Sequence, residues 1–285
     1  VLSLAEGREL AALADTRGLR VGSAPDTFLG GAHQRARALI DGGTVGRVTS
    51  GSCHVMSIGV EHWHPNPGFF YRQGAGPVLD IGPYYVTNLV QLLGPVAAVT
   101  AMSMTPAPER LISSEPRAGE RIPVETPTTL HAVLEFVSGA VVTLGTSWDV
   151  RQHGHASMEL YGTEGTLHVP DPNFFGGDLA IGSSEEAPPV AAPGWPHGEA
   201  HPFDTVNQRH PDGMKANYRT AGLADMANAI AAGRAHRCSL ELALHAVEVM
   251  TAILASAERR AFVEIESRCE RPVPLGPAAA RALMA

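Results

Sequence analysis

The chain has 285 residues, of which 44% are hydrophobic and 18% charged, and its formal net charge is −8. These values exclude intrinsic disorder of the whole chain and allow one large or two modest domains with a substantial core. The acidic balance repels phosphate backbones, and no basic run is interleaved with aromatics, so we expect no nucleic-acid partner. No continuous apolar run reaches the roughly 18 residues that span a bilayer, so we expect no membrane partner.

Residues 1–47 predict a helix, a short strand and a second helix. Apolar residues recur at helical spacing over 4–15, with Ser3 as a possible N-cap and Gly18 after the last turn. Residues 19–22 follow as a strand, and residues 33–41 as a second helix. This order is typical of the end of a parallel α/β domain.

From residue 48 onward the pattern predicts a sheet-centred domain. Six segments are rich in β-branched residues and alternate between apolar and polar positions: 48–57, 96–104, 129–137, 141–149, 157–161 and 166–169. Short connections between them favour antiparallel neighbours. Apolar periodicity predicts three helices, at 80–93, 223–232 and 239–260. The fold class is therefore α/β, more narrowly α+β, with an open and mostly antiparallel sheet flanked by helices.

Two irregular stretches, 106–127 and 182–213, interrupt this pattern with prolines, glycines and charges. Long loops in compact domains are lids, subunit contacts or disordered segments, and the sequence does not choose among these. The cysteines Cys53, Cys238 and Cys269 are too few and too far apart for a disulfide framework or a zinc site. We therefore expect reduced thiols and a cytoplasmic protein.

The most informative segment is the predicted helix from Asp80. It begins after two glycines that resemble a dinucleotide fingerprint, but Leu79 holds the third glycine position and no strand precedes it, so we reject a phosphate loop. Asp80, Tyr84, Asn88 and Gln91 fall on one helical face. Such a stripe indicates either a capping aspartate beside a solvated face, or a carboxylate that orients a phenol for proton transfer to or from a substrate oxygen.

A family resemblance rests on this same segment. Residues 74–84 read Gly-Ala-Gly-Pro-Val-Leu-Asp-Ile-Gly-Pro-Tyr, and Leu-Gly-Pro closes the helix. The motif resembles the catalytic helix of Gfo/Idh/MocA oxidoreductases, and residues 34–47 and 238–265 resemble other segments of that family. The resemblance implies a Rossmann domain that binds NAD or NADP, and an open-sheet domain that holds sugars, inositols or related polyols and often mediates oligomerisation.

Carried onto this chain, the resemblance implies two domains and a homo-oligomer. Residues 1–47 would be the C-terminal part of the dinucleotide-binding domain, and residues 48–285 the substrate-binding and oligomerisation domain. Tyr84 is implied to be the acid/base, and Asp80 its partner. The turn that contains Pro25, Asp26 and Phe28 is implied to pass the nicotinamide.

Five further side chains are candidates for hydrogen bonding to a polyol: His62, His64, Tyr71, Arg72 and Asn88. The two histidines lie on one side of an extended segment, close enough to share a metal. No third ligand is spaced nearby, so we assign no metal site.

The sequence thus predicts an NAD(P)-dependent oxidoreductase of polyols or related carbonyl compounds. The family's Glu-Lys-Pro motif and phosphate-binding glycine loop would lie upstream of Val1, so we expect this chain alone neither to bind the cofactor tightly nor to turn over. Two alternatives remain open. One is a non-catalytic sugar-binding or oligomerisation module, and the other is a metal-dependent lyase or isomerase that uses the histidines.

Overall fold

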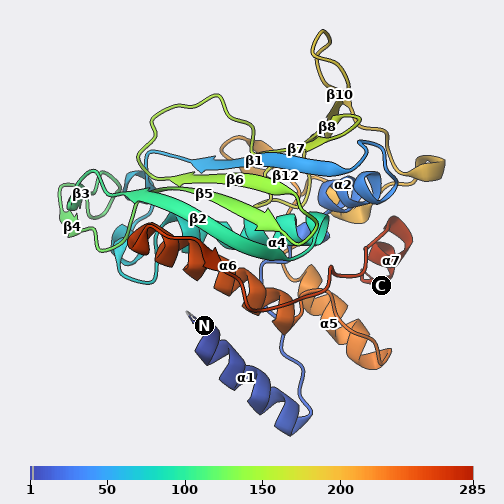
Figure 1. Cartoon of the computed structure of the whole chain (residues 1–285), viewed down its shortest axis with the longest axis horizontal. Coiled ribbons are helices and arrows are strands. Elements are labelled where there is room, and N and C mark those ends of the chain that lie inside the picture. Colours follow the sequence, from blue (N-terminus) through green and yellow to red (C-terminus); the bar gives the residue numbers. More distant parts are fainter. Residues whose placement is uncertain (2, 285) are drawn as a thin grey trace.

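A nine-stranded sheet forms the centre of the computed structural model, which describes residue 1 and residues 3–284 (Figure 1). Its strand order is β10-β9-β8-β7-β1-β6-β5-β2-β13. Within the described residues, β1 and β6 are the one parallel pair of this sheet, which confirms the mostly antiparallel prediction. The strands are β1 Val48–Met56, β2 Val96–Met104, β5 Thr129–Phe136, β6 Val141–Ser147, β7 Met158–Gly162, β8 Thr166–Val169, β9 Ala180–Gly182, β10 Val190–Ala191 and β13 Val263–Glu264.

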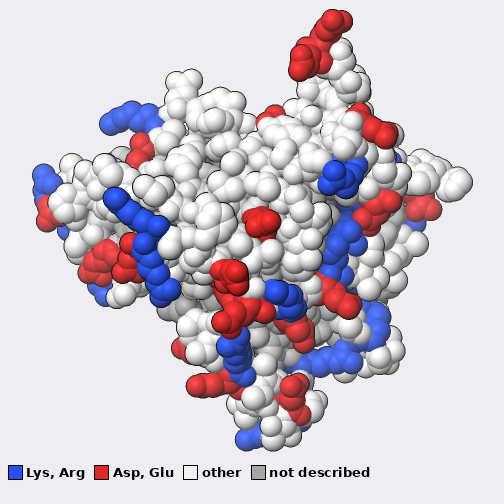
Figure 2. All heavy atoms as spheres, viewed as in Figure 1, with Lys and Arg blue, Asp and Glu red and all other residues white. Residues whose placement is uncertain are grey.

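Helices cover one face of the sheet and leave the other open. The helices are α1 Leu4–Arg17, α2 Gly31–Asp41, α3 Pro77–Asp80, α4 Gly82–Leu93, α5 Ala221–Ala231, α6 Leu240–Arg259 and α7 Pro277–Ala282. Helix α6 lies along β2, and α4 packs beside α6 (Figure 1). Strand β5 alternates accordingly: Leu130, Ala132 and Leu134 are buried, whereas Val133 is 37% exposed. Figure 2 shows few charged side chains over β1, β6, β5 and β2.

The ends of α1 follow the sequence prediction. The Ser3 hydroxyl accepts a hydrogen bond from the Glu6 N–H at 3.2 Å, and Gly18 ends the helix with a φ of 60°. The strand predicted at 19–22 is wrong, because that segment makes a single antiparallel bridge, between Gly22 and Ser239. It runs past the N-terminus of α6 instead of joining the sheet.

The predicted helix 80–93 is divided. Helix α3 ends at Asp80, and α4 begins at Gly82 with Pro83 in its first turn. Residue Ile81 occupies the N-cap position of α4, so Asp80 does not cap it. Gly76 precedes α3 with a φ of 90°, and a Cβ there would lie 3.0 Å from the Thr126 side chain. The glycine therefore permits a sharp and close turn into the helix.

Within the described residues, α6 is the one helix long and apolar enough to cross a membrane by length and composition. The helix predicted at 239–260 is confirmed, and it holds no continuous apolar run because Glu241, His245 and Glu248 interrupt it. Two buried polar side chains join it to β2. His245 Nε2 accepts from the Val96 N–H, and Ser256 Oγ accepts from the Ala101 N–H, both at 2.9 Å. These bonds identify α6 as a core helix of the sheet domain.

Both irregular stretches contain ordered elements. Residues 106–127 form a hairpin of β3 Glu109–Leu111 and β4 Arg121–Pro123. The stretch 182–213 contains β10, two 3₁₀ turns and β11 Gln208–His210, which pairs with β12 Gly213–Lys215. Much of this second stretch is exposed.

The last two residues of the predicted polar stripe, Asn88 and Gln91, lie in the core. Asn88 and Gln91 are 0% and 1% exposed. The Asn88 amide donates to His33 Nδ1 at 3.2 Å, and Gln91 Nε2 donates to the His33 carbonyl at 3.3 Å. His33 Nε2 in turn donates to the Phe174 carbonyl at 2.8 Å. Neither of the two readings of the stripe anticipates this arrangement, which fastens α2 to α4.

We expect His33 to make the protein sensitive to acid. Burial lowers the pKa of His33 from its usual 6.5 to about 4. Between these two pH values the imidazole is therefore protonated in the unfolded chain and neutral in the folded chain. Its contribution to stability is therefore present above pH 6.5 and is lost as the pH falls toward 4, at about 1.4 kcal/mol per pH unit. Urea unfolding of His33→Gln across pH 4–7 should show a shallower pH dependence than the parent. Exposed His197→Gln serves as the control, and an unchanged slope in His33→Gln would contradict the assignment.

Candidate active site

A cavity of about 260 Å³ lies beside Tyr84. One wall is the loop from Gly22 to Asp26, and the opposite wall is the start of α5. The lining is largely apolar, with Pro25, Leu223 and Met226 among its residues. The cavity thus brings together three of the predicted site residues, Tyr84, Pro25 and Asp26, from segments distant in the sequence.

Arg219 fixes the surroundings of the Tyr84 hydroxyl. Its Nη1 donates to the Tyr84 oxygen at 3.2 Å, and its guanidinium lies 5.4 Å from the centre of the Tyr84 ring. Its Nη2 donates to the carbonyl and side-chain oxygens of Asn173 at 3.1 and 3.0 Å. The guanidinium is therefore oriented, and it supplies the cationic neighbour that a proton-transferring phenol requires.

Asp26 anchors the segment next to Arg219, at the start of α5. Its Oδ2 accepts from the N–H groups of Thr220 and Gly222, both at 2.9 Å, at the first turn of α5. Thr220 has a φ of 99°, which a β-branched residue rarely adopts. The Asp26 carboxylate satisfies the free amides there and holds this strained residue next to Arg219.

We expect Asp26→Ala to lower the free energy of unfolding by about 1–2 kcal/mol, because two amides of α5 lose their acceptor. Asp26→Asn should cost less. Chemical denaturation checks this, with the exposed Asp178→Ala as the control. Equal stability of Asp26→Ala and the parent would show that solvent replaces the carboxylate.

Asp80 lies near this cavity wall but does not line it. The side chain is half-buried, and desolvation raises its pKa, an effect that nearby His64 opposes. No hydrogen bond between Asp80 and Tyr84 occurs among the described residues. The predicted pair is therefore divided between the end of α3 and the start of α4 and is not joined by a hydrogen bond.

A second cavity of about 310 Å³ lies between α1, α4 and α6. It shares the segment Gly22–Pro25 with the first cavity, so Pro25 stands between the two. Phe28, in contrast, is 2% exposed and belongs to the main core. The structure therefore gives Phe28 a packing position, away from both cavities.

The candidate polyol ligands are dispersed. His62 Nδ1 lies 2.8 Å from Ser113 Oγ, and His64 Nδ1 accepts from the Asn66 N–H at 3.0 Å. Arg72 is exposed and lines a different cavity, near the β3–β4 hairpin. Tyr71 is fully buried, as is Asn88. None of these five side chains lines the cavity beside Tyr84.

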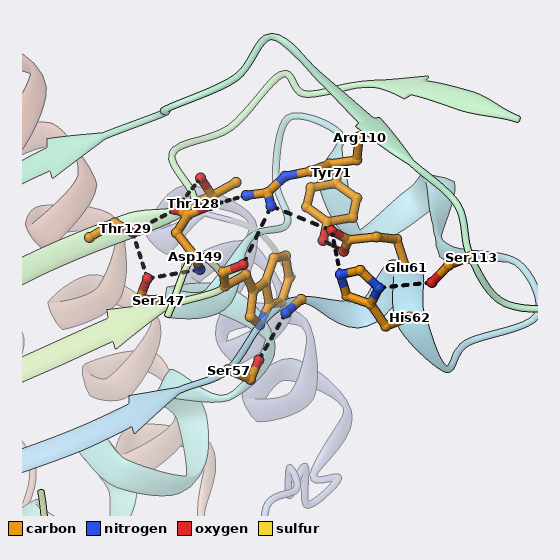
Figure 3. A network of polar contacts seen from close by, with 12 residues as sticks. Ser57, Glu61, His62, Tyr71, Arg110, Ser113, Thr128, Thr129, Ser147 and Asp149 are labelled. Atoms are coloured by element: carbon orange, nitrogen blue, oxygen red, sulfur yellow. Dashed lines mark hydrogen bonds and ion pairs between the residues drawn. The ribbon is translucent and has the colours of Figure 1, made fainter. Parts of the chain in front are cut away.

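Tyr71 belongs to a buried ionic network at the end of the sheet (Figure 3). Its hydroxyl donates to Glu61, whose other oxygen lies 3.4 Å from Arg110 Nη1. Arg110 also pairs with Asp149, which accepts from the hydroxyls of Thr128 and Thr129 at 2.7 and 2.6 Å. The network attaches the β3–β4 hairpin to the sheet and orders the loop that precedes α3.

No group of three or more His, Cys, Asp or Glu side chains in the described part of the chain is arranged to hold a metal ion. The cysteines are free, and burial raises the pKa of Cys269 to about 11. Sequence reasoning missed Arg219, Asn173 and the network of Glu61, Arg110 and Asp149. In the sequence each of these is an isolated polar residue outside any periodic pattern, so nothing marks it as part of a site.

The fold and the site together define a class of protein. The open, mostly antiparallel sheet is covered on one face by helices, and the Asp80–Tyr84 segment lies where α3 ends and α4 begins. Residues 33–168 match the GFO/IDH/MocA C-terminal domain. This match covers slightly less than half of the chain, so residues 33–168 are similar to the C-terminal domain of Gfo/Idh/MocA proteins.

Solved structures share this fold. An NAD-binding oxidoreductase from Klebsiella pneumoniae matches with a TM-score of 0.71 and 20% identity, over 94% of this chain and 72% of that one. Levoglucosan dehydrogenase in complex with NADH matches with 0.68 and 20%, over 94% and 71%. A super-repressor mutant of Gal80p from Saccharomyces cerevisiae matches with 0.69 and 14%, over 93% and 70%. At these identities the likeness shows the fold alone. A search of curated protein sequences finds no significant match.

Proposed function

We propose that this protein is an NAD(P)-dependent oxidoreductase acting on a sugar, an inositol or a related polyol, with Tyr84 as its acid/base. The observation that carries the proposal is the Tyr84 hydroxyl, which is held by Arg219 at the wall of a small cavity. The match of residues 33–168 to the GFO/IDH/MocA C-terminal domain supports a nicotinamide cofactor, as do two structures of the same fold, an NAD-binding oxidoreductase and a dehydrogenase bound to NADH.

The cavity fits the nicotinamide end of such a cofactor. Its walls offer the apolar side chains of Pro25, Leu223 and Met226 to a flat ring, and a phenol hydroxyl stands at the edge. When bound, the nicotinamide accepts or donates the hydride. We propose that Pro25 contacts the ring directly. Asp26 would act indirectly, because its carboxylate holds the start of α5, which forms the opposite wall.

The chain's own residues then handle the proton. During oxidation, Tyr84 acts as a phenolate and accepts the proton of the substrate hydroxyl. During reduction, the neutral phenol donates that proton back. Arg219 stabilises the phenolate form. Asp80 is proposed to help position Tyr84 from the preceding turn, although the two side chains share no hydrogen bond in the described chain.

We also propose that residues 1–47 and 48–285 belong to two domains, and that the protein forms a homo-oligomer. The open face of the sheet, with exposed Val133 and Met102, is compatible with a second copy. Residues Leu29 and Leu39 share the core of the sheet domain, so the two proposed parts are in contact.

A non-catalytic binding module is the second candidate. The super-repressor mutant of Gal80p has the same fold, and no hydrogen bond joins Asp80 to Tyr84 in the described part of this chain. Such a module would bind a polyol without hydride transfer.

Reading the DNA upstream of codon 1 and assaying hydride transfer distinguishes these functions. We expect polyol-dependent reduction of NAD or NADP at 340 nm by the extended protein, by which we mean this chain together with any segment encoded in frame upstream of it. Polyol binding by calorimetry in both proteins, with transfer in neither, would favour the non-catalytic module. Activity that a chelator abolishes would favour the metal-dependent lyase or isomerase.

A further inference from the structure

The ligand chemistry of the cavity is constrained by Arg219. It is the one Lys or Arg side chain that lines the cavity in the described chain. A guanidinium carries five N–H donors. Three are used, one on Tyr84 and two on Asn173, and the described residues offer no acceptor to Nε or to the second hydrogen of Nη1.

Arg219 also lacks a counter-charge. No carboxylate within the described residues lies within 4.0 Å of its nitrogens, and the side chain is exposed to solvent. The one acidic residue of the cavity lining, Asp26, is 8% exposed, and its Oδ2 already accepts two backbone N–H groups. The cavity therefore presents an oriented positive charge with spare donors and a negative charge that is already satisfied.

We infer that the ligand of this cavity is a sugar acid, and that its carboxylate pairs with Arg219 while a hydroxyl meets Tyr84. This inference rests on the proposed function and narrows its substrate class from polyols in general to anionic ones.

Two physical points favour a carboxylate at this wall. Arg219 and Tyr84 are themselves in contact, so a ligand at this wall meets a cation and a phenol together. A charged acceptor gains more from a guanidinium than a neutral hydroxyl does.

The test compares acids with their neutral counterparts on the full chain. Calorimetry at low salt measures binding of D-glucuronate against D-glucose, and of D-galacturonate against D-galactose. We expect each acid to bind at least tenfold more tightly than its neutral partner. The preference should disappear in Arg219→Gln, persist in part in Arg219→Lys, and remain in Arg209→Gln, an exposed arginine outside the cavity.

Three outcomes would overturn the inference: equal affinity in both pairs, a preference that survives Arg219→Gln, and stronger binding of glucose 6-phosphate than of glucuronate, which would assign the site to a phosphate. Circular dichroism and thermal midpoints of the variants exclude unfolding as the cause of a loss. The proposed function fails separately. If the acid preference depends on Arg219 but the extended protein transfers no hydride, the cavity is a sugar-acid site of a non-catalytic module.

Discussion

Replacing Arg110 with methionine is expected to lower the free energy of unfolding by about 3–5 kcal/mol. The change leaves the carboxylates of Glu61 and Asp149 without their shared cation, although their side chains are only 3% and 15% exposed. An uncompensated buried charge is among the costliest single defects in a folded protein. Urea unfolding at pH 7 measures the effect.

The same hairpin provides a matched control. Arg121 pairs with Glu109 at 3.6 Å, and both side chains are more than half exposed. Arg121→Met should therefore change stability by no more than about 0.5 kcal/mol. A triple variant with Glu61→Gln, Arg110→Met and Asp149→Asn should recover part of the loss, because no charge remains unpaired. Equal small effects of Arg110→Met and Arg121→Met would show that the network is solvated.

The second large effect is expected from Tyr84→Phe. Removing the hydroxyl removes the acid/base, so the rate of hydride transfer by the extended protein should fall by about 10²–10⁴-fold. In this chain alone, the affinity for a polyol should fall by about tenfold or less, the size of one hydrogen bond. Stability should be nearly unchanged, because the hydroxyl contacts Arg219, which is exposed.

Tyr218→Phe is the control for this variant, since Tyr218 directly precedes Arg219 and its hydroxyl donates to the Thr205 carbonyl at 2.9 Å. Its catalytic rate should stay near that of the parent. Retention of full activity by Tyr84→Phe would remove Tyr84 from the mechanism and leave Asp80 as the candidate acid/base.

The sheet could be predicted from the sequence because its pattern is local. Strands β5 and β8 each alternate between a covered and an open face, and that alternation can be read residue by residue. The break between α3 and α4 was not predicted. A proline in a first turn is compatible with one continuous helix, and the chain's path past Thr126 also acts on this segment.

The site was predictable only in part, because its remaining members meet through the tertiary fold. The motif pointed to Tyr84, but its partner Arg219 lies 135 positions further along the chain. Asn88 shares the face of Tyr84 by spacing, yet α2 covers it with His33. Helical periodicity tells which residues share a face and does not tell what packs against each turn of that face.

The position of β1 has a consequence for synthesis of the protein. This strand comes first in the chain but lies between β7 and β6, so both of its edges stay unpaired until β6 has been synthesised, and one edge stays unpaired until residue 162 has left the ribosome. Pairings so distant in sequence form slowly, and open strand edges attract other nascent chains. Fragments that end before Val141 are therefore expected to aggregate, and chaperones that shield β1 during translation should raise the yield of native protein.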